Sequence, residues 1–192
     1  MRIRNVLIAC GLVTIASAPA AAQYSPMVMG VSIGGSLSDF QSPDSDSRWG
    51  FTGGLFVGKA TYRTLTVLEV NYVQKGGDNV AGIGGNVRVD YVEVPLTFGG
   101  VGRTRSGAGR ARLYGGIAVA FKVTCDADTV VCDNAEGVEW VSPFGLQLSR
   151  YAEGERFVAI DVRYNIPLSR AFEGGAYNQT WQFKVIVGRT KG

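Results

Sequence analysis

The sequence contains no histidine, which removes several classes of function before any motif is considered. Without an imidazole there is no Ser-His-Asp hydrolase, no His-ligated metal site and no histidine general base. Charged residues make up only 18% of the chain, against the ~25% typical of globular domains, so a disordered, solvating chain is also excluded. We therefore expect a folded protein that is not an enzyme and uses no metal or cofactor.

The N-terminal segment, 1–22, has the features of an export signal. Arg2 and Arg4 form a charged start, an apolar run follows, and small residues precede a cleavage site after Ala22. A lipoprotein signal ending at Cys10 is the alternative, although the apolar run continues well past that cysteine. We expect a secretory signal peptide that is cleaved after Ala22.

The mature domain, 23–192, lacks both a basic surplus and a long apolar run. Without Arg2 and Arg4 the chain keeps 17 of its 19 basic residues against 16 acidic ones, so it has no basic footprint for nucleic acid. No stretch beyond the signal approaches the ~18 apolar residues of a membrane helix. The apolar residues must therefore be spread over many short elements.

Apolar and polar residues alternate with a period of two along the mature domain, which predicts β-strands. In the last strand, Trp181, Phe183 and Val185 alternate with Gln182 and Lys184. Seven further stretches repeat this alternation, within 29–34, 52–58, 68–73, 91–98, 112–123, 138–149 and 158–168. The pattern predicts eight strands of about 10 to 13 residues, long enough to cross a bilayer at a tilt.

The connections between these strands alternate in character. Segments rich in Gly, Asp, Ser and Asn (38–48, 76–87, 125–136 and 170–178) alternate with the short turns 60–63 and 151–155 and the longer 100–110. An even number of antiparallel strands places both termini at one end and the acidic loops at the other. The sequence therefore predicts an all-β fold, an eight-stranded antiparallel up-and-down transmembrane β-barrel of a Gram-negative outer membrane. The termini and Arg103, Arg105 and Arg110 are then expected to face the periplasm.

Aromatic residues cluster near the loop-bearing ends of the strands, on the apolar face. They are Trp49, Tyr72, Phe121, Trp140 and Trp181. Amphipathic rings prefer the membrane interface, so these residues are expected to form a girdle there. The alternative is that they are core aromatics of a soluble sandwich, because alternation alone does not tell which face is inside.

The opposite face of the strands carries small residues and charges of both signs. The charges are Glu69, Glu93, Asp161, Arg163 and Lys184. Buried charges must be paired, so we expect one lumen network that plugs the barrel. Eight strands leave an interior just filled by side chains, so a wide diffusion pore is not expected.

Two neighbouring segments, LEVNYVQKGG (68–77) and DYVEVPLTF (90–98), resemble the outer-membrane protein β-barrel domain family of PorT-like small barrels. The matching positions are Glu69, Tyr72, Gln74, Lys75, Gly76, Tyr91, Glu93 and Pro95. The resemblance implies an integral, monomeric barrel whose partners are outer-membrane lipids and the barrel-assembly machinery. Such barrels usually end on an aromatic residue, whereas this chain ends at Gly192 without one.

Only two cysteines, Cys125 and Cys132, belong to the mature domain. An exported protein lives in an oxidising compartment, where such a pair normally forms a disulfide. We expect this bond at the tip of the third external loop. Metal binding with the nearby Asp126, Asp128 and Asp133 is the competing interpretation, but it would need carboxylates in place of two further thiols.

These features predict a non-catalytic outer-membrane barrel that acts as a structural or surface-binding element, with an extracellular ligand or surface partner. The alternative is a soluble exported barrel that binds a small hydrophobic ligand, as lipocalins do. That alternative expects an apolar lumen and often a flanking helix, and neither is evident in the sequence.

Overall fold

The structure is a computed structural model that describes residues 26–40, 46–78, 86–104, 109–127, 132, 135–152, 155–171 and 177–191. The predicted signal peptide (1–22) and its cleavage site after Ala22 lie outside these residues. Among the residues described, no helix is long and apolar enough to cross a membrane.

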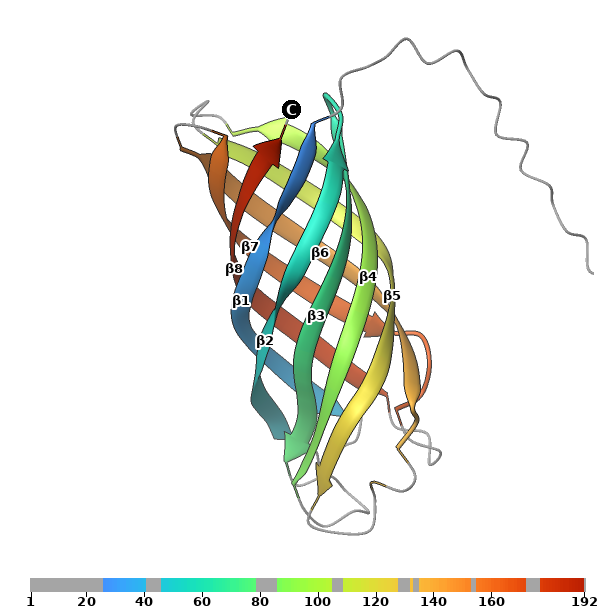
Figure 1. Cartoon of the computed structure of the whole chain (residues 1–192). Coiled ribbons are helices and arrows are strands. Elements are labelled where there is room, and N and C mark those ends of the chain that lie inside the picture. The colour runs from blue at the N-terminus through green and yellow to red at the C-terminus, as the bar shows by residue number, and fades with distance from the viewer. Residues whose placement is uncertain are drawn as a thin grey trace, which may run out of the picture.

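Eight antiparallel strands form a closed barrel in chain order, which confirms the predicted fold class (Figure 1). They are β1 (Met27–Phe40), β2 (Asp46–Ala60), β3 (Thr64–Asp78), β4 (Val87–Arg103), β5 (Gly109–Ala127), β6 (Val138–Tyr151), β7 (Arg156–Pro167) and β8 (Asn178–Lys191). The barrel closes because β1 pairs with β8 as well as with β2.

The two ends of the barrel differ. Met27 and Lys191 are cross-strand partners, so the described chain begins and finishes at the same end, together with the β2–β3, β4–β5 and β6–β7 connections. We call this the turn end, which lies uppermost in Figure 1, and the opposite end the loop end.

Seven of the eight strands are longer than the predicted 10 to 13 residues, and for these seven the predicted length was wrong. They run from 12 residues in β7 to 19 in β5. The ladder continues because inward-facing residues near the loop end, such as Phe40, Val87 and Val89, still pack together inside the barrel. Parts of the expected loops 38–48, 76–87 and 125–136 are therefore strand.

The barrel is apolar outside and polar inside, with the phase that the alternation predicts. On the outer face Leu113 is 71% exposed and Leu55 is 65% exposed. On the inner face Arg163 and Lys184 are each 1% exposed. Gly34 lies opposite Lys184 across the β1–β8 pair, and a Cβ at Gly34 would lie 2.8 Å from the Lys184 Cα. Glycine is needed for that close approach.

Two apolar clusters occupy the lumen, one near each end. The cluster at the turn end contains Val28, Phe157, Ala159 and Ile186, with Phe56, Ala60 and Leu65 packed against it. The cluster at the loop end contains Phe40, Val87, Val89, Tyr91, Ala120, Ala135 and Ala171. The charged side chains of the lumen lie between them.

Candidate functional site

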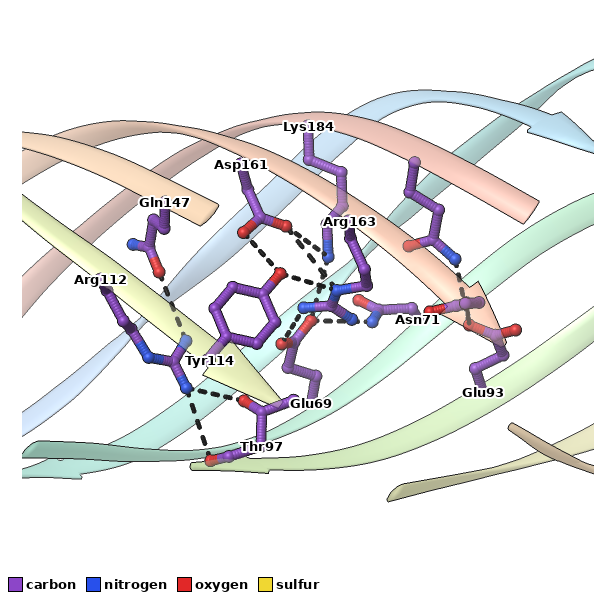
Figure 2. A network of polar contacts seen from close by, with 12 residues as sticks. Glu69, Asn71, Glu93, Thr97, Arg112, Tyr114, Gln147, Asp161, Arg163 and Lys184 are labelled. Carbon is purple, nitrogen blue, oxygen red and sulfur yellow. Dashed lines mark hydrogen bonds and ion pairs between the residues drawn. The ribbon is translucent and has the colours of Figure 1, made fainter. Parts of the chain in front are cut away.

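Four of the five predicted lumen charges meet in one cluster (Figure 2). Arg163 donates a hydrogen bond to Glu69, and the Lys184 Nζ lies 3.1 Å from the other oxygen of that carboxylate. Asp161 Oδ2 lies 3.6 Å from Lys184 Nζ and 3.8 Å from Arg163 Nε. Two carboxylates and two cations from β3, β7 and β8 thus form a balanced group, which we call the lower cluster.

Uncharged polar side chains fix the geometry of the lower cluster. The Tyr114 hydroxyl donates to Asp161 Oδ1 at 2.7 Å and accepts from Arg163 Nε at 2.9 Å. Asn71 Nδ2 donates to Glu69 Oε2 at 2.9 Å. Sequence reasoning missed both residues, although Tyr114 and Asn71 lie on the inward phase of their strands. The available signal was a polar side chain on the buried face of its strand, which needs hydrogen-bond partners.

Glu93, the fifth predicted charge, lies apart from the lower cluster. Its Oε1 is 2.7 Å from the Nζ of Lys75, and the same ammonium lies 3.3 Å from Glu139 Oε2. The Tyr91 hydroxyl donates to Glu139, and its ring lies 4.8 Å from the Lys75 Nζ. Lys75, Glu93 and Glu139 form a second group that lies nearer the loop end. We call it the upper cluster because we take the loop end as the top of the barrel, which is opposite to the view in Figure 1. Lys75 and Glu139 were not predicted as members of the network.

The register of β3 and β4 explains this separation. Glu93 is the cross-strand partner of Asn71, so it lies one inward-facing position closer to the loop end than Glu69. Two amides extend from β7 and β8 to Glu93: Gln182 Nε2 donates to Glu93 Oε2 at 3.1 Å, and Asn165 Nδ2 donates to the same oxygen at 3.3 Å. The predicted single network is therefore two ionic clusters, with an amide layer on Glu93.

Arg112 adds a further buried cation on the turn-end side of the lower cluster. Its Nη2 donates to Thr97 Oγ1 at 2.8 Å, and its guanidinium lies 4.4 Å from the ring centroid of Tyr114. Among the residues that the structure describes, the buried ionic side chains on the inner face are the acids Glu69, Glu93, Glu139 and Asp161 and the bases Lys75, Arg112, Arg163 and Lys184. The four negative and four positive charges sum to zero. Such pairing offsets the large cost of removing buried charges from water.

Small gaps remain between the described side chains of the lumen. A gap between the lower cluster and the turn-end apolar cluster has a volume of about 20 Å³, and its lining includes Glu69, Arg112 and Phe157. A neighbouring gap, closer to the turn end, has about 30 Å³. Each offers room for about one or two waters.

The five predicted girdle aromatics all lie on the outer face towards the loop end. Trp49, Phe121, Trp140 and Trp181 are between 45% and 66% exposed, and Tyr72 is partly exposed. Trp49 and Trp181 share the β1 residue Leu37 as cross-strand partner, so they lie at one level. The Tyr72 hydroxyl donates to Asp90 Oδ2 at 2.6 Å on the same outer face.

A disulfide joins Cys125 and Cys132, whose Cα atoms are 5.6 Å apart. Its predicted place was wrong for one partner. Cys125 belongs to β5, where it pairs with Val89 and packs against the loop-end apolar cluster, rather than at a loop tip. The ladder continues through Cys125 because its partner strand β4 begins at Val87. Asp128 and Asp133, which were considered as metal ligands, lie outside the described residues.

Comparison with known proteins relates this chain to other barrels by fold. Neisserial surface protein A has a TM-score of 0.55 and 11% identity, with 85% of this chain and 96% of that chain covered. Ail, the attachment invasion locus protein of Yersinia pestis, solved with the heparin analogue sucrose octasulfate, has a TM-score of 0.45 and 10% identity over 84% of this chain and 98% of that one. No family model and no curated protein matches the chain. At these identities the likeness shows the fold alone.

Proposed function

We propose that this protein is an integral, non-catalytic outer-membrane β-barrel with a closed lumen. The observation that supports this proposal most directly is the distribution of side chains, which is the reverse of that in a soluble protein. Large apolar residues are exposed around the outer face of the strands, whereas ionic residues are buried inside the barrel. Among the described residues, thirty large hydrophobic side chains are exposed, far more than the single modest patch that a soluble monomer tolerates. A bilayer covers such a surface, and the outward aromatics fit its interface.

Three features of the lumen support its being closed: the small volume of its gaps, the balance of its buried charges and the apolar clusters near its two ends. The gaps between the lower cluster and the turn end measure about 20 and 30 Å³, far below the 300 Å³ or more of a small-molecule pocket. The ionic side chains are balanced, so none of them needs a permeating ion as partner. Apolar clusters lie on both sides of the ionic clusters and keep water away. The same volumes disfavour the lipocalin-like alternative.

The orientation follows from the two unlike ends. A secretory signal and a Gram-negative host would bring the chain to the barrel-assembly machinery, and the turn end would remain in the periplasm. The loop end would then face the outside. Acidic side chains gather there: Asp39, Asp46, Asp78, Asp126 and Glu136. We propose that these loops meet an extracellular ligand or surface partner, and that the barrel is a monomer.

The shared fold with Neisserial surface protein A, an outer-membrane barrel, supports this assignment. Membership of the PorT-like family remains a prediction from the matching positions in β3 and β4. It implies the same architecture and location, and it assigns no catalytic residue.

Cell fractionation tests the proposal. The protein should remain in the outer-membrane fraction after carbonate washing, and it should run at different apparent masses on gels before and after boiling. In planar bilayers the purified protein should give no steady conductance. Recovery in the soluble periplasmic fraction would overturn the membrane assignment, and a large steady conductance would overturn the closed lumen.

A further inference from the structure

Basic side chains gather on the outer face of the turn end. Lys59 of β2, Arg150 of β6, Arg156 of β7 and both Arg189 and Lys191 of β8 are exposed there. β6, β7, β8, β1 and β2 are consecutive around the closed barrel, so the five residues occupy one continuous side. We call them the basic collar; its strands end at the upper rim in Figure 1.

The collar lies directly at the edge of the apolar band, by which we mean the exposed apolar residues on the outer face of the strands. Four of its members are each two residues from an exposed apolar residue on the same face, in the pairs Val57/Lys59, Leu148/Arg150, Val158/Arg156 and Val187/Arg189. If the apolar band lies in the hydrocarbon of the bilayer, as the proposed function requires, the next outer-face position towards the turn end lies among the lipid headgroups. Long basic side chains reach such a level readily, because their stems tolerate apolar surroundings.

The collar brings like charges together on the outer face of the barrel. Arg156 and Arg189 are direct cross-strand partners, and Met27 is flanked on its two sides by Lys59 and Lys191. None of these four cations makes an ion pair with a described residue. Like charges directly opposite one another destabilise a sheet. An external anion placed between them would remove this repulsion.

On the remaining side of the barrel, the corresponding described positions of the outer face are uncharged. At the turn-end positions of β3, β4 and β5, the outer face carries Thr66, Gly100 and Ala111 instead. We propose that the basic collar binds the phosphodiester headgroups of anionic phospholipids, such as phosphatidylglycerol, in the leaflet at the turn end. Arginine suits this role because its planar fork donates two hydrogen bonds to one phosphate.

Native mass spectrometry of the full-length mature protein tests this inference. The protein is extracted into detergent and equilibrated with equimolar phosphatidylglycerol and phosphatidylcholine, and the retained lipids are counted. We expect phosphatidylglycerol to be retained over phosphatidylcholine by about tenfold or more, since each basic residue near an anionic surface contributes severalfold. Preincubation in 1 M salt should reduce the preference, because the Debye length falls to about 3 Å.

Two triple variants with the same charge change separate the collar from general electrostatics. R150Q/R156Q/R189Q removes three collar charges. R63Q/R103Q/R110Q removes three arginines that line an open groove at the same end of the barrel. The collar variant should lose most of the preference for phosphatidylglycerol, whereas the groove variant should keep it. R150K/R156K/R189K retains the charges and should keep a reduced preference.

The outcomes distinguish this inference from the proposed function. A wild-type protein that lacks heat-dependent gel mobility and leaves the membrane on carbonate washing contradicts the membrane assignment itself. A heat-modifiable wild-type barrel without lipid preference, or an equal loss in both glutamine variants, overturns the collar. If the collar glutamine variant does not fold, the salt dependence of the wild type and the lysine variant decide the question.

Discussion

Replacing Arg163 with methionine should destabilise the barrel strongly. Arg163 is 1% exposed, donates to Glu69 and lies 2.9 Å from the Tyr114 hydroxyl. The R163M variant leaves Glu69 and Asp161 with Lys184 as their only remaining cation in the lower cluster. Removing one partner of a buried ionic group typically costs about 3–5 kcal/mol, and we expect a loss of that size in the free energy of unfolding.

The double variant E69Q/R163M isolates the electrostatic part of this loss. It leaves Asp161 and Lys184 as a balanced pair, 3.6 Å apart, while the volume change at position 163 is the same as in R163M. Removing both partners is less costly than removing one, so the double variant should be more stable than R163M, by about 1–3 kcal/mol. Simple loss of packing would predict no such recovery.

Urea unfolding in phospholipid vesicles measures these differences. Trp49, Trp140 and Trp181 are exposed on the outer face, so their fluorescence should report the transfer from lipid to water. The loss of heat-dependent gel mobility gives an independent readout. A cost below about 1 kcal/mol for R163M, or a double variant less stable than R163M, would refute the reasoning that pairing governs the lower cluster.

The upper cluster should respond unequally: K75M leaves two glutamates facing each other and should cost about 3 kcal/mol or more, whereas E139Q leaves one balanced pair and should cost much less in the same urea assay. Intact mass after alkylation should show Cys125 and Cys132 unreactive until reduction, and their replacement by serine should cost at most about 2–3 kcal/mol because the closed loop is short. Two free thiols before reduction would contradict the disulfide. Protease added to intact cells should cut within 38–48 or the β5–β6 connection; cleavage in the β4–β5 turn instead would reverse the proposed orientation.

The sequence alone determined the fold class and the two faces of every strand. Alternation is a local property: in a strand each residue points opposite to its neighbours, so Leu68 and Glu69 must lie on different faces wherever the strand is placed. An even number of strands then requires the start of the first strand and the end of the last strand to lie at the same end of the barrel, as Met27 and Lys191 do. The sequence alone also excluded two kinds of feature. The absence of histidine excludes histidine-dependent catalysis and His-ligated metal sites, and the absence of a long apolar run beyond the signal segment excludes a membrane helix there.

The length of the strands could not be determined from the local sequence pattern. The alternation near Phe40 and Val87 is short, and glycine and aspartate in those segments are typical of loops. The ladder nevertheless extends there, because these side chains pack against residues from distant strands inside the loop end. Cys125 is strand for the same reason, since its neighbour across the ladder is Val89.

Only the tertiary structure decided which charges are partners. The phase of each strand placed Glu69, Glu93 and Arg163 on the inner face, but not at which level. Arg163 and Glu69 are 94 residues apart in sequence, and Lys75 and Glu139 are 64 apart. Their contact depends on the stagger of every intervening strand pair around a closed, tilted barrel, which is set by the closure of the whole sheet rather than by any one segment.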